Sequence, residues 1–416
     1  MSRLRQWKSH LALFFLIVGP GIITANVDND AGGIATYSVA GAKFGYSLLW
    51  VLLPTCFLLV LVQEMCCRMG VVTGKGLSAL IRERFGVGVS FYLMLALVVT
   101  NIGNVIADFA GVAASAEIFG IPRSLAVPLG AFLLWHVVVK GSYRTVERVF
   151  FVACVFYLTY LASGLLAKPD WSAALHQSLV PHMAWTQESF YMIVGIVGTT
   201  IAPWMQFYQQ ASVVEKGIPL KHLRYSQIDT VIGAIVVTIV CYFIVLACAA
   251  TLHRNGIVIE TAGDAATALA PAAGRYCAGL FAFGLLTASL FGAAILPIST
   301  ATSVCEAMGW ESGVDRKFIQ APHYYAIFSF ILVIGAVVAL VAGRNMLVPI
   351  MLLSQVINGV LLPVVIFIML RITNDRAIMG PHVNSRLFSV VAWTGAIVTA
   401  AMSLILTVLT LWPAHA

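Results

Sequence analysis

The sequence predicts an all-α polytopic membrane protein that crosses the bilayer about eleven times and whose first and sixth helices are broken. Composition is the first observation behind this fold class: 60% of the 416 residues are hydrophobic, 10% are charged, and the mean hydropathy is +0.95. A soluble domain carries about 25% charged residues, so this chain cannot cover a surface that faces water. The other two observations are a long series of apolar segments and two interruptions that lie five segments apart.

The apolar segments are separated by short connectors that carry polar residues, glycine or proline. The predicted spans are 14–40, 44–67, 89–115, 124–140, 148–167, 187–214, 227–251, 276–307, 322–342, 346–371 and 388–412. Residues 1–416 then form a single transmembrane domain. The matching interruptions in spans one and six favour two inverted five-helix repeats, 14–167 and 187–371, followed by one further helix at 388–412.

The basic residues predict the orientation of the chain. With the N-terminus in the cytoplasm, most of the 24 Lys and Arg residues lie on the cytoplasmic side. The exceptions are Lys43, Arg123, Lys168, Arg254, Arg275 and Arg344. This imbalance follows the positive-inside rule and predicts a multi-pass protein of the plasma membrane. The net charge of +7 then reflects loops that face anionic lipid, so we expect the bilayer as a partner and no nucleic acid.

Neither the cysteines nor the N-terminus indicates a secreted protein. The eight cysteines lie in or beside apolar segments and are interpreted as small buried hydrophobes rather than as a disulfide framework. The opening MSRLRQWKSH, followed by an apolar run, resembles the start of a secretory signal. Because the apolar stretch continues past Asp30 into a second span, we expect it to be retained.

The first span is organised around two carboxylates, Asp28 and Asp30. Its middle also carries polar side chains and poor helix formers, namely Asn26, Asn29, Gly32 and Gly33. This combination predicts a helix that unwinds at membrane depth, with Gly32 and Gly33 at the break. Non-helical backbone is tolerated there only where it is buried in protein or lines a wet cavity. We therefore expect Asp30 to hold a cation halfway across the membrane.

The sixth span is interrupted by Pro203, which removes a backbone donor and obstructs the preceding turn. Thr199 and Thr200 can satisfy part of the backbone that this proline frees. Spans one and six are five apart, the offset at which two broken helices face each other in an inverted repeat.

In these segments the chain resembles the Nramp divalent-metal transporters. That family reads DPGN in its first span, followed by ATDIAAGSRFGYSLLW; here Asp30 is followed by AGG and IATYSVAGAKFGYSLLW. RMGVVTGKGLSALIRERFG at the end of span two is similar to the family's RLGIVTGRDLAEACRERY. IADFAGVAASAEIFGIP in span three matches in length and tail. The resemblance implies a LeuT-like fold, alternating access, and an ion held between helices one and six.

Three departures from the family pattern are informative. Gly33 stands where the family has Asn, and Ala202, Pro203 and Trp204 stand where it has Met-Pro-His. The carboxylate pair of the third span is reduced to Asp108, because Gly111 replaces the second acid. These substitutions resemble the Nramp-related magnesium transporters, a branch that prefers a harder ion.

The remaining ligand chemistry also favours a hard ion. Thioether and imidazole ligands suit softer metals, whereas carboxylate, carbonyl and water suit Mg²⁺ and Mn²⁺. Mg²⁺ keeps several of its waters, and Gly33 and Ala202 would leave room for them. We therefore expect Asp30 and the Ala202 carbonyl to meet a largely hydrated ion. Four more side chains could reach it directly or through water: Asp28, Gln206, Gln209 and Gln355. The metal is the transported substrate, and no cofactor is expected.

Proton coupling is not expected, because titratable groups are lost beside the predicted site. Trp204 replaces the family's histidine and Gly111 replaces an acid, which leaves Asp108 as the candidate coupling or pathway residue. A facilitator driven by the membrane potential is the resulting hypothesis. The sequence shows no sign of an obligate protein partner.

Several alternatives stay open at this stage. The chain could be a proton-coupled Mn²⁺/Fe²⁺ symporter of the ordinary Nramp type, or an amino-acid carrier of the same architecture. Two aspartates at the break argue against a substrate carboxylate there. An enzyme is not expected, because an intramembrane protease needs acids on facing helices and Asp28 and Asp30 share one segment. Asp30 could also act only as a helix cap.

Overall fold

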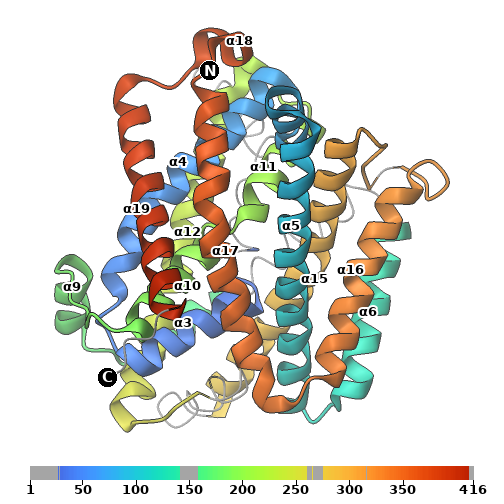
Figure 1. The fold of residues 1–416 in the computed structure, drawn as a ribbon. Coiled ribbons are helices and arrows are strands. Elements are labelled where there is room, and N and C mark those ends of the chain that lie inside the picture. Colours follow the sequence, from blue (N-terminus) through green and yellow to red (C-terminus); the bar gives the residue numbers. More distant parts are fainter. Residues whose placement is uncertain are drawn as a thin grey trace, which may run out of the picture.

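The computed structural model describes residues 27, 29–140, 158–259, 265, 275–314 and 316–411, and every regular element in them is helical. The longer helices pack side by side in a bundle (Figure 1). Their bounds are α3 Ala31–Phe44, α4 Leu49–Thr73, α5 Leu77–Ile118, α6 Arg123–Lys140, α8 Leu158–Leu166, α9 Trp171–Leu179, α10 Gln187–Thr200, α11 Pro203–Glu215, α12 Leu223–Thr251, α15 Arg275–Met308, α16 Pro322–Val341, α17 Arg344–Thr373, α18 Arg376–Met379 and α19 Arg386–Leu411.

Nine helices in the described part of the chain are long and apolar enough to cross a membrane. α10 and α11 count there as one interrupted span, Gln187–Glu215. The predicted first and fifth spans, 14–40 and 148–167, lie partly outside the described residues. The all-helical membrane fold agrees with the sequence prediction, and the exact number of spans stays a prediction.

The helix ends follow local chemistry. Asp30, Asp170, Thr186 and Asp375 each precede a helix and accept a backbone N–H of its first turn. Gly86 has φ +85° inside α5, where two helical pieces meet at a kink. Only glycine adopts that backbone conformation without strain, so the kink is encoded locally.

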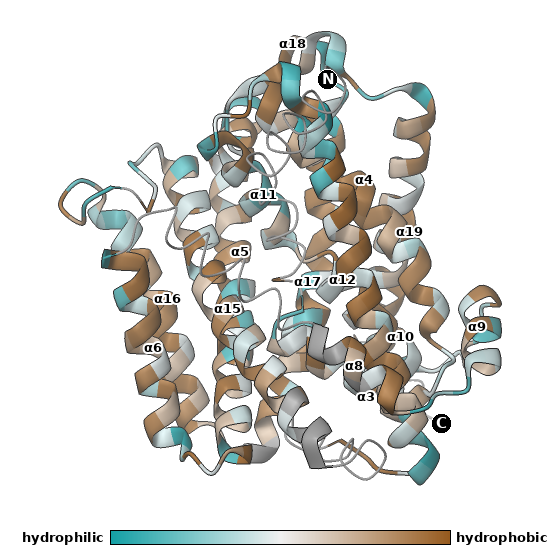
Figure 2. Cartoon of the chain, turned by 180° about the vertical axis from the view of Figure 1, so that it is seen from behind, coloured by the Kyte–Doolittle hydropathy of each residue, from teal (hydrophilic) through white to brown (hydrophobic). Residues whose placement is uncertain are grey.

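The long helices α5 and α15 pack along each other, with α16 and α6 beside them (Figure 1). α3 crosses the bundle close to α10, α12 and α17. Brown, apolar residues cover the outward sides of α6, α16 and α19, while hydrophilic residues concentrate at the two ends of the bundle (Figure 2). Exposed side chains on α16 and α19 are large and apolar, for example Phe330, Val333, Ile397 and Leu404. Such a surface suits lipid contact and leaves the polar residues for the interior.

Candidate functional site

Asp30 lies at the point where the chain enters α3. The residue has φ −65° and ψ −177°, and its Oδ1 accepts the Gly33 N–H at 2.7 Å. Only 4% of the residue is exposed. A carboxylate at a helix N-terminus meets the positive end of the helix dipole and the amide donors of the first turn. Asp30 therefore does cap a helix, and this cap lies at the buried start of α3.

Asp108, in the middle of α5, faces the same helix end. Its Oδ1 accepts the Ala31 N–H at 3.2 Å, and the residue is completely buried. Its Oδ2 finds no hydrogen-bond donor among the residues that the structure describes. The carboxyl groups of Asp108 and Asp30 are close enough to interact electrostatically. Two buried acids at one helix end form a strongly electronegative point inside the bundle.

Gln355, on α17, lies over the first turn of α3. A Cβ added at Gly32 would collide with the Gln355 amide nitrogen and would lie 3.3 Å from Asp30 Oδ1. The Gln355 side chain also meets Asn104 and Asn358, which bond to each other across α5 and α17. Polar side chains of α5 and α17 are thus linked, through Gln355, to the first turn of α3.

The break between α10 and α11 falls at Ile201 and Ala202, where Pro203 starts the second helix. The Ala202 carbonyl accepts the Met205 N–H at 3.0 Å. The Gln206 amide group lies 2.8 Å from that carbonyl oxygen and 2.6 Å from the Pro203 carbonyl oxygen, distances that suit its NH₂ group as donor. In this conformation the Ala202 carbonyl therefore has partners within α11.

A hydrogen bond ties this break to α3. The hydroxyls of Tyr37 and Thr200 lie 2.7 Å apart, and Thr200 donates to the Ile196 carbonyl. The two interrupted segments are thus connected at Thr200, the last residue of α10. The predicted role of Thr199 and Thr200 for the backbone that Pro203 frees stays a prediction, because the Thr200 hydroxyl bonds to Ile196 one turn further back.

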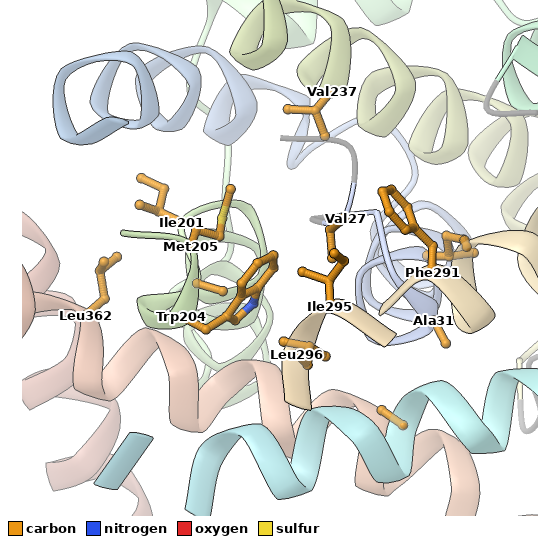
Figure 3. Close-up of a cluster of buried hydrophobic side chains, with 14 of the residues drawn as sticks. Val27, Ala31, Ile201, Trp204, Met205, Val237, Phe291, Ile295, Leu296 and Leu362 are labelled. Carbon is orange, nitrogen blue, oxygen red and sulfur yellow. The ribbon is translucent and has the colours of Figure 1, made fainter. Parts of the chain in front are cut away.

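Trp204 fills the space beside the break. The residue is 1% exposed, and its backbone carbonyl accepts the Ser299 hydroxyl at 3.3 Å. Figure 3 shows its indole beside Ile295 and Leu296 of α15, with Ile201 and Met205 nearby. An apolar ring at this place excludes water from one side of the candidate site and offers no titratable group.

Two predicted helix breaks are wrong. Gly32 and Gly33 lie inside α3, in its first turn, and the interruption comes before Ala31. The physical reason is that Asp30 caps the helix and satisfies the Gly33 N–H, so the glycines need no unwound backbone. Gly32 instead provides room for Gln355.

The other predicted residues are placed as follows. The Gln209 amide donates to the Thr230 hydroxyl of α12 at 3.3 Å, and Thr230 is not a hydrogen-bond partner of Asp30. A Cβ at Gly111 would collide with the Ser289 hydroxyl and lie 2.5 Å from the Ala31 Cβ, so packing replaces the missing acid there. Asp28 lies outside the described residues. Ligation by Asp30, Gly33, Ala202, Gln206, Gln209 and Gln355, and the pathway roles of Asp108, Gly111 and Trp204, stay predictions.

Sequence reasoning missed one close neighbour of the site. The Cys241 thiol of α12 donates to the Asn29 Oδ1 at 3.0 Å, directly before Asp30. The sequence indicates Cys241 only as a small buried hydrophobe. Nothing near Asn29 in the sequence points to a partner 212 residues away. The described residues contain no group of three or more His, Cys, Asp and Glu side chains that could hold a metal ion.

The sequence profile described as "Natural resistance-associated macrophage protein-like", Nramp, matches residues 21–409. The chain belongs to the Nramp family. This Nramp chain is 26% identical over 404 residues to the divalent metal cation transporter MntH of Bacillus subtilis, which covers 94% of this chain and 91% of that protein. It is 29% identical over 429 residues to MntH 1 of Pseudomonas aeruginosa, which covers 95% and 92% respectively.

Solved structures of related shape share the fold of this Nramp chain. The manganese transporter of Eremococcus coleocola, solved with an aromatic bis-isothiourea substituted compound, has a TM-score of 0.77 at 22% identity and covers 95% of this chain and 87% of its own. MhsT in complex with L-phenylalanine has a TM-score of 0.60 at 14% identity and covers 93% and 97%. The predicted LeuT-like fold is therefore confirmed.

Proposed function

We propose that this Nramp chain transports a divalent metal ion across the membrane and binds it at Asp30. Family membership and the names of the MntH relatives support this function. The single observation that carries it is the buried Asp30 carboxylate at the start of α3, with Asp108 beside it and the α10–α11 break tied to the same helix. A buried, electronegative point between interrupted helices attracts a cation and repels an anionic solute.

The preferred ion under this proposal is Mg²⁺, with Mn²⁺ as a competing substrate. The groups around Asp30 are carboxylate, amide and carbonyl oxygens, which are hard ligands. The small residues Gly33 and Ala202 leave room for water on the ion. For the Ala202 carbonyl to reach the ion, Gln206 must release it, so ion binding and a rotation of the Gln206 side chain are linked in this mechanism.

Transport would be driven by the membrane potential and not by protons. A divalent ion gains about 4.6 kcal/mol per 100 mV, twice the value for a single charge. Trp204 supplies no titratable group beside the break. Alternating access would then expose Asp30 first to one side and then to the other by movement of the broken helices.

Binding and flux of Mg²⁺ and Mn²⁺ test the proposed function when Asp30→Ala is compared with the unmodified protein. We expect calorimetric binding in detergent and uptake into proteoliposomes to fall at least about tenfold, because one carboxylate is lost from a site that has few charges. Asp170→Ala is the matched control, since Asp170 caps the exposed helix α9. Unchanged uptake by Asp30→Ala would refute the proposed site.

A proton-coupled Mn²⁺ symporter is the second candidate, and the adjacency of Asp30 and Asp108 favours it. Two neighbouring buried acids can exchange a proton when one of them binds a metal. An internal pH dye in the same proteoliposomes distinguishes the two functions. Acidification in proportion to Mn²⁺ uptake would establish the symporter, and uptake without acidification would establish the facilitator.

A further inference from the structure

Asp229 is a further carboxylate in a membrane helix, and the mechanism above leaves it unused. It lies on α12, six residues after the start of the helix at Leu223, and is completely buried. Ionisable groups inside a membrane domain are costly and are kept mainly where they serve a substrate or ion pathway. The side chains around it therefore decide whether it has such a role.

Polar side chains from three helices gather around Asp229. The Cys67 thiol of α4 donates to the Ser226 hydroxyl at 3.1 Å, and the Asp229 carboxyl lies within electrostatic range of that thiol. The Thr230 hydroxyl accepts the Gln209 amide of α11 at 3.3 Å. We call this set the inner polar cluster; it comprises Gln63, Cys67, Gln209, Ser226, Asp229 and Thr230.

Gln63 gives the independent sign that the inner polar cluster takes a ligand. It precedes Cys67 by four residues and thus lies on the same face of α4, one turn deeper in the membrane. It is 3% exposed, and neither its amide oxygen nor its amide nitrogen has a hydrogen-bond partner among the described residues. An amide that is buried without protein partners is unfavourable, so Gln63 needs a partner from water or an ion.

The inner polar cluster continues from the Asp30 site along α11. The Gln206 amide reaches back to the carbonyls of the helix break, and Gln209 lies three residues further on the same helical face. Both glutamines are completely buried. One face of α11 therefore carries polar groups from the α10–α11 break to the contact with Thr230, and the neighbouring Gln210 bonds to Lys75 of the α4–α5 connection.

We propose that the inner polar cluster is a second, transient cation-binding site, at which Asp229 binds the hydrated divalent ion after it leaves Asp30. The carboxylate provides the charge, and the oxygens of Gln63, Gln209 and Thr230 contact the waters of the ion. This inference rests on the proposed function and adds a residue to it. It predicts that Asp229 governs the rate of passage, whereas Asp30 governs equilibrium binding.

The first test compares Asp229→Asn with Asp30→Ala and with Asp170→Asn, an isosteric control on the exposed cap of α9. We expect Asp229→Asn to bind Mn²⁺ in detergent within about twofold of the unmodified protein, and to transport it into proteoliposomes at least about tenfold more slowly. Normal transport by Asp229→Asn would overturn the proposal. Failure of the unmodified protein to transport any divalent ion would instead refute the proposed function itself.

Cys67 provides a second test that does not need a variant at Asp229. A variant that retains only Cys67 is reconstituted and treated with a charged thiol reagent from the side of the α4–α5 connection. We expect Cys67 to be labelled and Mn²⁺ to change the labelling rate, because the cluster opens during transport. Cys66 is the matched control, since it is equally buried and points about 100° away on α4. If Cys67 is not labelled under any condition, the inner polar cluster does not open during transport and the proposal is overturned.

Discussion

At the scale of single residues, glycines shape the candidate site because they leave room for neighbouring polar side chains. Gly32 allows the Gln355 amide to approach α3, and Gly292 of α15 occupies a position where a Cβ would collide with the Asp108 carboxylate. Gly111 gives the same closeness to Ser289 and Ala31. Each glycine thus provides room for a polar group near Asp30, in helices where glycine otherwise lowers stability.

Gly32→Ala tests this interpretation. The added methyl group must displace Gln355, so we expect a loss of about 1–3 kcal/mol in stability and weaker binding of Mn²⁺. Thermal unfolding in detergent and calorimetry measure the two effects. The double variant Gly32→Ala with Gln355→Ala should recover much of the stability, because the collision is gone. Equal destabilisation of the single and double variants would contradict the predicted contact.

At the scale of elements, side-chain networks fasten helix ends that the sequence separates widely. Arg68 of α4 binds both oxygens of Glu64, at 2.9 and 3.0 Å, and donates to the His382 carbonyl and the Asn384 side chain before α19. Its guanidinium also lies 5.4 Å from the centre of the Phe388 ring. One arginine therefore holds the end of α4 against the connection between α18 and α19.

Arg68→Met should destabilise the protein by about 3 kcal/mol, because it leaves the largely buried Glu64 carboxylate without its cation. Arg68→Lys should recover only part of this loss, since an ammonium cannot form the paired contacts. Arg84→Met is the matched control: its pair with Asp375 is half exposed and should contribute at most about 1 kcal/mol. Chemical unfolding in detergent gives all three values, and similar losses for Arg68→Met and Arg84→Met would contradict the network's role.

At the scale of the whole molecule, the structure separates two polar ends by an apolar belt. α9 lies at one end, and α18 with the end of α4 lies at the other (Figure 1). The ion pair of Arg84 with Asp375 also brings the α4–α5 and α17–α19 connections together at that second end. Two of the connections that the positive-inside rule assigns to the cytoplasm are therefore neighbours in space.

Thiol labelling of intact cells tests the orientation. Ser172→Cys on α9 and Ser385→Cys before α19 are nearly isosteric, and both serines are exposed. In a cysteine-depleted background, a membrane-impermeant reagent should label Ser172→Cys on intact cells and Ser385→Cys only after permeabilisation. The opposite pattern would place the N-terminus outside.

The sequence by itself determined the membrane class and the break at Pro203, because hydropathy and proline act within a few neighbouring residues. It placed the first break two residues too late, since it could not show that Asp30 caps α3. Only the tertiary structure decided that Asp108 meets Ala31, that Gln355 lies over Gly32 and that Cys241 bonds to Asn29. These contacts join residues 77 or more positions apart, and they depend on how whole helices pack, which no local pattern of residues records.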